Sequence, residues 1–123
     1  MKFRAAVLRQ MSTDMPYSIS KPVSVEEVSV DPPSTGEVLV RIRAAGLCHS
    51  DLSVINGDRP RGLPIVLGHE ASAEVVELGE GVNNLSVGDH VVLVFVPSCG
   101  CCMPCSEGRP ALCVPGQTAN AEG

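Results

Sequence analysis

Four cysteines near the carboxyl end of the sequence have the spacing of a metal-binding lobe. They follow the pattern C-x2-C-x2-C-x7-C and are Cys99, Cys102, Cys105 and Cys113. Four thiolates this close along a chain can all reach one tetrahedral Zn²⁺ ion. The segment holds few large apolar side chains, so burial alone does not fold it and a bound metal would supply the missing folding energy. The spacing therefore predicts a closed structural zinc site over residues 97–114.

Two other uses of these cysteines stay open beside zinc. Bacterial iron–sulfur motifs also contain C-x2-C-x2-C, but their fourth cysteine follows sooner and precedes a proline, whereas Cys113 precedes Val114. Disulfides are disfavoured because neighbours such as Cys101 and Cys102 bridge poorly and no other feature indicates a secreted chain. Cys101 is a fifth thiol beside a four-ligand site. We expect it to be a spare, and an exchange of roles with a neighbouring cysteine stays open.

A second cluster of chemically active residues lies in the middle of the chain. Cys48 and His69 offer two of the three protein ligands that a catalytic zinc requires. Asp51 can hold the imidazole of His69 from outside the metal, and Glu70 can act as an outer carboxylate or a transient ligand. Taken singly, a buried cysteine usually packs in the core and a lone histidine usually makes structural hydrogen bonds. The residues alone leave the site incomplete, because no third strong ligand is evident.

The segments that must position these residues have mainly the pattern of strands. Only one Tyr and two Phe occur among 123 residues, so the core must be built from Val, Leu, Ile and Ala, and valines often alternate with polar residues. A short helix is expected over residues 50–56, capped at Ser50 and stopped by Gly57. The expected strands cover residues 3–9, 23–30, 37–45, 65–67, 74–78 and 90–96.

These elements predict one mostly β domain, a small barrel or sandwich. Residues 115–123 carry no strand or helix pattern and resemble a frayed tail or a cut linker. No strand is followed by G-x-G-x-x-G, and Gly79-Glu80-Gly81 leads to another strand. The sequence therefore offers no dinucleotide-binding motif.

Charge and hydropathy exclude several classes of partner. The formal net charge is −5, and the nine Lys and Arg residues are scattered, so no basic stripe is available for nucleic acid. Arg4 and Arg9 interrupt the amino-terminal segment before it reaches the length of a signal peptide, and no stretch approaches a membrane span. We therefore expect no nucleic acid or membrane partner and a cytoplasmic location, where reduced thiols suit metal binding.

Four motifs then occur in the order and with the spacing of one known family. They are Gly46-Leu47-Cys48-His49-Ser50-Asp51, Leu67-Gly68-His69-Glu70, Val87-Gly88-Asp89-His90-Val91 and the cysteine lobe. Nearly the whole chain resembles the catalytic domain of the zinc-dependent medium-chain alcohol dehydrogenases. That resemblance implies a GroES-like, partly open β-barrel with one or two short helices and a cysteine-rich zinc-binding lobe.

The resemblance also implies roles for individual residues. Cys48 and His69 would bind a catalytic zinc, with Glu70 beside the metal and Asp51 close by. Ser50 would contact the alcohol oxygen and start a proton relay, and His49 would lie near the cofactor pyrophosphate. The four cysteines of the lobe would hold a second, structural zinc. The implied reaction oxidises a small-molecule alcohol to an aldehyde or ketone, with zinc as Lewis acid and NAD or NADP as hydride acceptor. Assembly into a homo-oligomer stays open.

The chain departs from the family pattern in three respects. Ala73 replaces a usual glycine, and Ser53 stands where many members carry a histidine that passes the proton to solvent. The family's third zinc ligand and its Rossmann domain lie beyond residue 123. Residues 1–114 are thus expected to be a GroES-like catalytic domain that is inactive without that Rossmann domain. The alternatives are a stand-alone GroES-like structural or interaction module and, with less support, an electron-transfer protein that uses the cysteine run.

Overall fold

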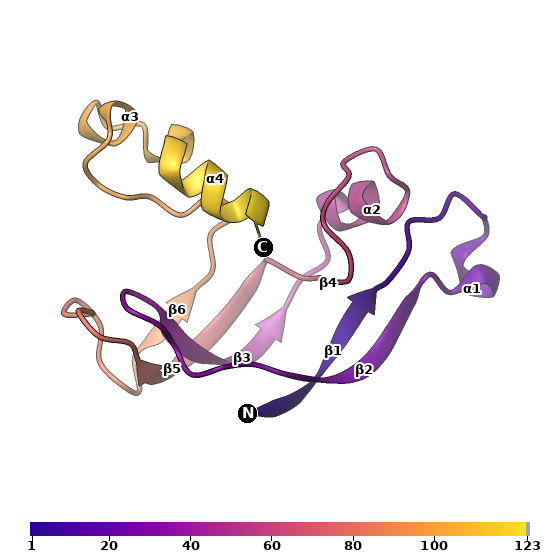
Figure 1. Cartoon of the computed structure of the whole chain (residues 1–123), viewed down its shortest axis with the longest axis horizontal. Coiled ribbons are helices and arrows are strands. Elements are labelled where there is room, and N and C mark those ends of the chain that lie inside the picture. The colour runs from indigo at the N-terminus through magenta and orange to yellow at the C-terminus, as the bar shows by residue number, and fades with distance from the viewer. Residues whose placement is uncertain (123) are drawn as a thin grey trace.

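The computed structural model describes residues 1–122 and consists of two small antiparallel sheets with short helices beside them (Figure 1). The first sheet has the strand order β2-β1-β4, and the second has the order β3-β5-β6. The strands are β1 Lys2–Leu8, β2 Val23–Ser29, β3 Val38–Ala45, β4 Ile65–Val66, β5 Ala71–Leu78 and β6 His90–Val92. The helices are α1 Tyr17–Ser20, α2 His49–Ile55, α3 Met103–Ser106 and α4 Val114–Glu122, with a 3₁₀ turn at Pro110–Leu112.

The mostly β class and the open architecture that the sequence predicts are confirmed. Among residues 1–122 the two sheets do not close into a barrel, and β3 and β5 form the longest strand pair. In Figure 1 the helices α2, α3 and α4 lie above the strands, whereas α1 lies at the far end beyond β2. The side of the sheets that carries α2 and α4 is therefore where the functional residues are gathered.

The core is small and is built from the aliphatic residues of β1 and β5. Leu8 and Val75 are fully buried, and Val7 and Ala73 are nearly so. Ala73 and Val75 lie two positions apart on β5, the central strand of its sheet, so they share one buried face. The alanine that replaces the family's usual glycine is thus a packed core residue.

Two boundaries differ from those that the sequence predicts. The helix begins at His49, with Cys48 rather than Ser50 as its N-cap, because Asp51 accepts a hydrogen bond from the Cys48 N–H in a capping box. The last strand ends at Val92 instead of Val96. Beyond it, the Phe95 carbonyl accepts a hydrogen bond from the Asn120 side chain of α4, so the chain has left the sheet.

The expectation that residues 115–123 lack regular structure is wrong for the described residues, since α4 spans Val114–Glu122. Cys113 anchors the first turn of the helix: its sulfur accepts a hydrogen bond from Gly116 N–H at 3.3 Å, and its carbonyl accepts one from Gln117. Pro115 is tolerated there because first-turn N–H groups have no helical partner. The helix has no apolar stripe, and for this reason the sequence pattern did not reveal it.

A separate observation concerns membranes. None of the helices formed by residues 1–122 combines the length and the apolar character that crossing a bilayer requires.

The close approach of α4 to residue 97 yields a prediction of definite sign. A Cβ at Gly116 would lie 1.7 Å from the Pro97 carbonyl oxygen. Helix propensity alone would make Gly116→Ala stabilising by about 1 kcal/mol. We expect instead a loss of about 1–3 kcal/mol in the free energy of unfolding, because backbone must move to relieve the clash.

Urea unfolding followed by circular dichroism measures this change. Gly62→Ala is the matched control, since a Cβ there would meet nothing within 4 Å, and it should change stability by less than about 0.5 kcal/mol. A Gly116→Ala variant as stable as the unsubstituted chain would show that α4 does not pack against residue 97.

Candidate metal centres and active site

The four cysteines of the lobe converge as their spacing predicts. The sulfurs of Cys99, Cys102, Cys105 and Cys113 all lie within 4.8 Å of one another. Two of them, Cys102 and Cys113, are 3.9 Å apart. Zn–S bonds of about 2.3 Å in a tetrahedron place the sulfurs about 3.8 Å apart. The lobe therefore has the size of a tetrahedral zinc site.

Backbone N–H groups prepare these sulfurs to carry negative charge. N–H groups of residues 101 and 102 lower the pKa of the Cys99 thiol to about 6. Burial acts in the opposite direction at Cys105 and raises the pKa of that thiol to about 12. Four sulfurs together cannot all ionise in this setting without a cation among them. The donor set thus fits a thiophilic divalent metal such as Zn²⁺.

The remaining cysteines fall outside this group of four. All six cysteines of the chain are free thiols, so none of them forms a disulfide. Cys101 is exposed, and its sulfur is 3.8 Å from that of Cys99 without joining the other three. The expectation that Cys101 is a spare thiol agrees with this position.

The second cluster forms at the ends of β3 and β5. One ligand atom each from Cys48, His69 and Glu70 lies within 4.8 Å of the others. The Ser50 hydroxyl lies among them, 3.0 Å from the Cys48 sulfur and 3.0 Å from His69 Nε2. The structure thus brings Glu70 close enough to complete a set of three ligands.

Local sequence explains this convergence. The pairing of β3 with β5 continues past the strands, where the Gly46 N–H donates to the Glu70 carbonyl at 2.7 Å. A Cβ at Gly46 would lie 3.3 Å from a Glu70 carboxylate oxygen, so glycine keeps this approach close. Cys48 then caps α2 and places Ser50 in its first turn.

Asp51 fixes the orientation of the imidazole. Its carboxylate is buried and lies 3.3 Å from His69 Nδ1, and it also accepts backbone N–H groups from Cys48 at 3.2 Å and Gly68 at 3.4 Å. An aspartate at Nδ1 favours the tautomer with the proton on that nitrogen. Nε2 then presents its lone pair to the cluster.

Two other residues singled out from the sequence lie apart from the cluster. His49 is exposed at the first position of α2. The Ser53 hydroxyl donates to the His49 carbonyl at 3.2 Å, so it serves the helix backbone and not the site.

Sequence reasoning missed three residues that border the cluster. Phe95 packs against His69 with ring centroids 5.0 Å apart, and the Arg59 guanidinium lies over the Phe95 ring, 5.3 Å from its centroid. The Asn120 side chain of α4 donates a hydrogen bond to the Phe95 carbonyl. The carbonyl and the side-chain oxygen of Asn120 accept hydrogen bonds from the Arg61 guanidinium. The scarcity of aromatic residues was the only sequence signal for Phe95.

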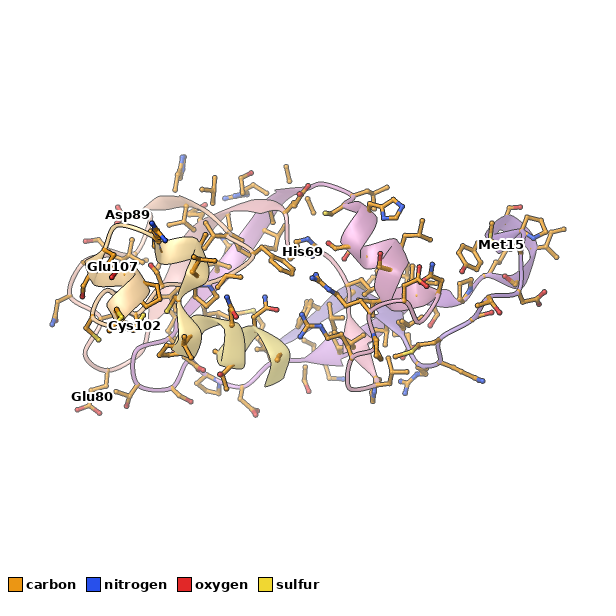
Figure 2. The ribbon with its side chains drawn as sticks, turned by 90° about the horizontal axis from the view of Figure 1, so that it is seen from above. Met15, His69, Glu80, Asp89, Cys102 and Glu107 are labelled. Carbon is orange, nitrogen blue, oxygen red and sulfur yellow. The ribbon has the colours of Figure 1, made fainter. Side chains whose placement is uncertain are left out.

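Two cavities meet at Ser50 and His69. The larger, of about 530 Å³, also contacts Val54, Ile65 and Phe95, and the smaller, of about 340 Å³, extends towards Cys48 and Glu70. Figure 2 shows His69 near the middle of the molecule and Cys102 towards one end, so the two clusters are separate. A small organic molecule in the larger cavity would have the Ser50 hydroxyl within reach.

Comparison with known proteins agrees with this picture. A curated relative, S-(hydroxymethyl)glutathione dehydrogenase from Synechocystis, is 43% identical over 124 residues, which cover 100% of this chain and 31% of the relative. Putative alcohol dehydrogenase D from Mycobacterium tuberculosis is 48% identical and is matched over 30% of its length by 96% of the chain. The chain thus spans about a third of these curated relatives.

Solved structures give the same result. Benzyl alcohol dehydrogenase from Acinetobacter calcoaceticus superimposes with a TM-score of 0.80 at 37% identity, over 94% of this chain and 30% of that one. An alcohol dehydrogenase zinc-binding domain protein from Burkholderia ambifaria reaches 0.86 at 39% identity, over 100% and 31%. Fold and cysteine lobe together define a GroES-like domain of the alcohol dehydrogenase type. The chain belongs to the alcohol dehydrogenase GroES-like domain family, whose profile matches residues 34–123.

The lobe predicts which thiol is required for metal retention. Cys113→Ser should lose the ion of the lobe and lower the thermal unfolding temperature, because binding of a structural zinc is coupled to folding. Cys101→Ser is the matched control and should keep the full zinc content. Elemental analysis after dialysis against a weak chelator measures this difference. Equal zinc loss in the two variants would contradict the four-sulfur site.

The contact between Asp51 and His69 predicts a tautomer. In the unsubstituted metal-free chain, ¹⁵N NMR above pH 8 should show His69 protonated on Nδ1. Asp51→Asn should reduce that preference and lower the free energy of unfolding by about 1–2 kcal/mol, since the capping box loses its carboxylate. Asp58→Asn, on an exposed loop, should change neither quantity. An unaltered His69 spectrum in Asp51→Asn would show that the carboxylate does not fix the ring.

Proposed function

We propose that this domain carries the zinc-binding and alcohol-binding half of a dehydrogenase active site, and that hydride passes to NAD or NADP held by a separate dinucleotide-binding domain. The observation that carries the proposal is the meeting of a cysteine sulfur, an imidazole and a carboxylate around the Ser50 hydroxyl, at the wall of a cavity. The alcohol dehydrogenase relatives support it. The chain spans only about a third of the length of these relatives, so oxidation of an alcohol with NAD or NADP is proposed for the whole enzyme and not for this domain alone.

The donor set of the central cluster fits zinc. Cys48, His69 and Glu70 offer one sulfur, one nitrogen and one oxygen, which are the ligand types of catalytic zinc sites, and three protein ligands leave a fourth position open. When bound there, zinc supplies Lewis acidity towards an alcohol oxygen. The four cysteines of the lobe offer a closed set that leaves no position for substrate.

Ser50 is placed to handle the proton of the alcohol. Its hydroxyl lies 3.0 Å from both the Cys48 sulfur and His69 Nε2, beside the proposed metal position, and its oxygen can accept a hydrogen bond from a ligand in the cavity. When the proton of an alcohol moves to Ser50 Oγ, the proton of Ser50 can leave on the other side. Ser53 is occupied by the helix backbone, so we propose that water takes over directly from Ser50.

The walls of the larger cavity give the site its preference for organic ligands. Val54 is buried beneath the cavity, and Ile65 and Phe95 contribute apolar surface around Ser50. Apolar walls displace water and orient a carbon skeleton against the hydroxyl-binding group. We propose a small-molecule alcohol or aldehyde as the ligand. His49, exposed at the first position of α2, is the proposed contact for a cofactor phosphate.

The role of Ser50 can be tested by binding. Benzyl alcohol titrated into the zinc-loaded chain should shift the NMR signals of Ser50 and His69. Ser50→Ala should weaken this binding about tenfold, since one hydrogen bond to a polarised oxygen is lost. Ser53→Ala is the matched control and should bind normally. Zinc binding without any response to the alcohol would favour the stand-alone structural module instead.

Catalysis by the isolated chain is a separate measurement. We expect no formation of NADH or NADPH from benzyl alcohol by the 123-residue chain, because hydride transfer requires a nicotinamide held in line with the alcohol carbon. Absorbance at the wavelength of the reduced nicotinamide measures this. Turnover at an ordinary dehydrogenase rate would contradict the proposal that a separate domain must hold the nicotinamide cofactor.

A further inference from the structure

Two arginines border the proposed alcohol site. Their side chains are held in place by neutral groups, so their positive charge is not neutralised. Arg59 lines both cavities, and Arg61 lines the larger one. Among the side chains that the structure describes, residues 1–121, neither arginine forms an ion pair with a carboxylate, whereas Arg9 and Arg43 each do. We call Arg59 and Arg61 the arginine rim.

Neutral groups hold the arginine rim in place. The Arg59 N–H donates to the Ser53 carbonyl at 2.8 Å, which ties the loop to α2, and the guanidinium lies over Phe95. Arg61 donates to the Asn120 carbonyl at 3.1 Å and to the Asn120 side-chain oxygen at 2.7 Å. An aromatic face and amide oxygens orient a guanidinium but leave its positive charge available to a ligand.

The acidic groups near the site are already occupied. Asp51 accepts two backbone N–H groups and faces His69 Nδ1. Glu70 borders only the smaller cavity and belongs to the proposed ligand set. The larger cavity is therefore lined by the two arginine charges and by the single carboxylate of Asp51, which leaves a surplus of positive charge.

We infer that the substrate is an alcohol or aldehyde that also carries an anionic group, bound by the arginine rim while its oxygen lies at Ser50. This inference rests on the proposed function and adds the class of substrate. Phe95 contacts both Arg59 and His69, so the rim and the reacting end lie on the same cavity, separated by about one aromatic ring. A guanidinium binds planar carboxylates in a bidentate manner and also binds phosphates. Of these two sources of negative charge, the position beside Ser50 favours a substrate carboxylate over a cofactor phosphate.

A pair of probes of equal shape tests the inference. 4-(Hydroxymethyl)benzoate and its amide, 4-(hydroxymethyl)benzamide, differ mainly in charge. Each is titrated into the zinc-loaded chain, with the signals of Ser50 and His69 as the readout. The benzoate should bind about tenfold more tightly than the benzamide, because a carboxylate forms charge-assisted hydrogen bonds to a guanidinium that a neutral amide does not. Added salt should reduce the ratio.

Variants locate the source of this preference. Arg59→Gln and, separately, Arg61→Gln should each lower the ratio severalfold, because the benzoate loses more affinity than the benzamide. Arg4→Gln, an exposed arginine on β1 that borders neither cavity, is the matched control and should keep the ratio. The salt dependence of the unsubstituted chain provides the same information without any substitution.

The results of these titrations distinguish a failure of this inference from a failure of the proposed function. Equal binding of benzoate and benzamide at Ser50 would overturn the anionic substrate and leave the alcohol site intact. No response to either probe would overturn both proposals. Inorganic pyrophosphate tests the alternative that the arginine rim binds a cofactor phosphate. Should Arg59→Gln weaken pyrophosphate binding but not benzoate binding, the arginine rim serves a cofactor phosphate and the inference is wrong.

Discussion

The backbone pairing of β3 with β5 is the constraint on which the site depends. It continues past the strand ends to the hydrogen bond between Gly46 and Glu70, and this brings two segments about twenty residues apart into contact. Cys48 follows one strand and His69 precedes the other, so this pairing brings their ligand atoms together. A change of one residue in this register would turn one partner to the opposite face of the sheet. The small core around Val75 holds the register because β5 is buried as the central strand.

The cysteine lobe and the substrate cavity are linked through α4. Cys113 belongs to the four-sulfur group and also anchors the first turn of α4, and Asn120 near the other end of this helix holds Phe95 and Arg61. A metal in the lobe would fix Cys113 and thereby the helix that reaches the cavity. A zinc ion in the lobe would in this way stabilise a wall of the larger cavity from a distance, through α4 and Asn120.

Sequence reasoning succeeded where the signal is local. The four cysteines lie within fifteen consecutive positions. The alternation of side-chain types along residues 37–45 identifies β3 directly. It failed at α4, whose conformation depends on a sulfur acceptor and on close contact with Pro97, neither of which leaves a periodic pattern. The arginine rim was missed for the same reason, because Arg61 and Asn120 are 59 positions apart and only the fold makes them neighbours. The third ligand of the central cluster lay between these cases: Glu70 was a candidate, but its distance to Cys48 depends on a turn that the sequence does not specify.

The contrast between the two metal clusters explains how one small domain can assign different tasks to similar ligands. The lobe surrounds its centre with four sulfurs and backbone N–H groups, so its full coordination leaves no room for a substrate. The central cluster offers three different donors, and its open side faces a cavity and the Ser50 hydroxyl. Asp51 then turns the histidine so that one nitrogen is satisfied by protein and the other faces the cluster. In the proposed function, reactivity would follow from incomplete coordination beside an organic cavity, and stability from complete coordination at the start of the helix that borders this cavity.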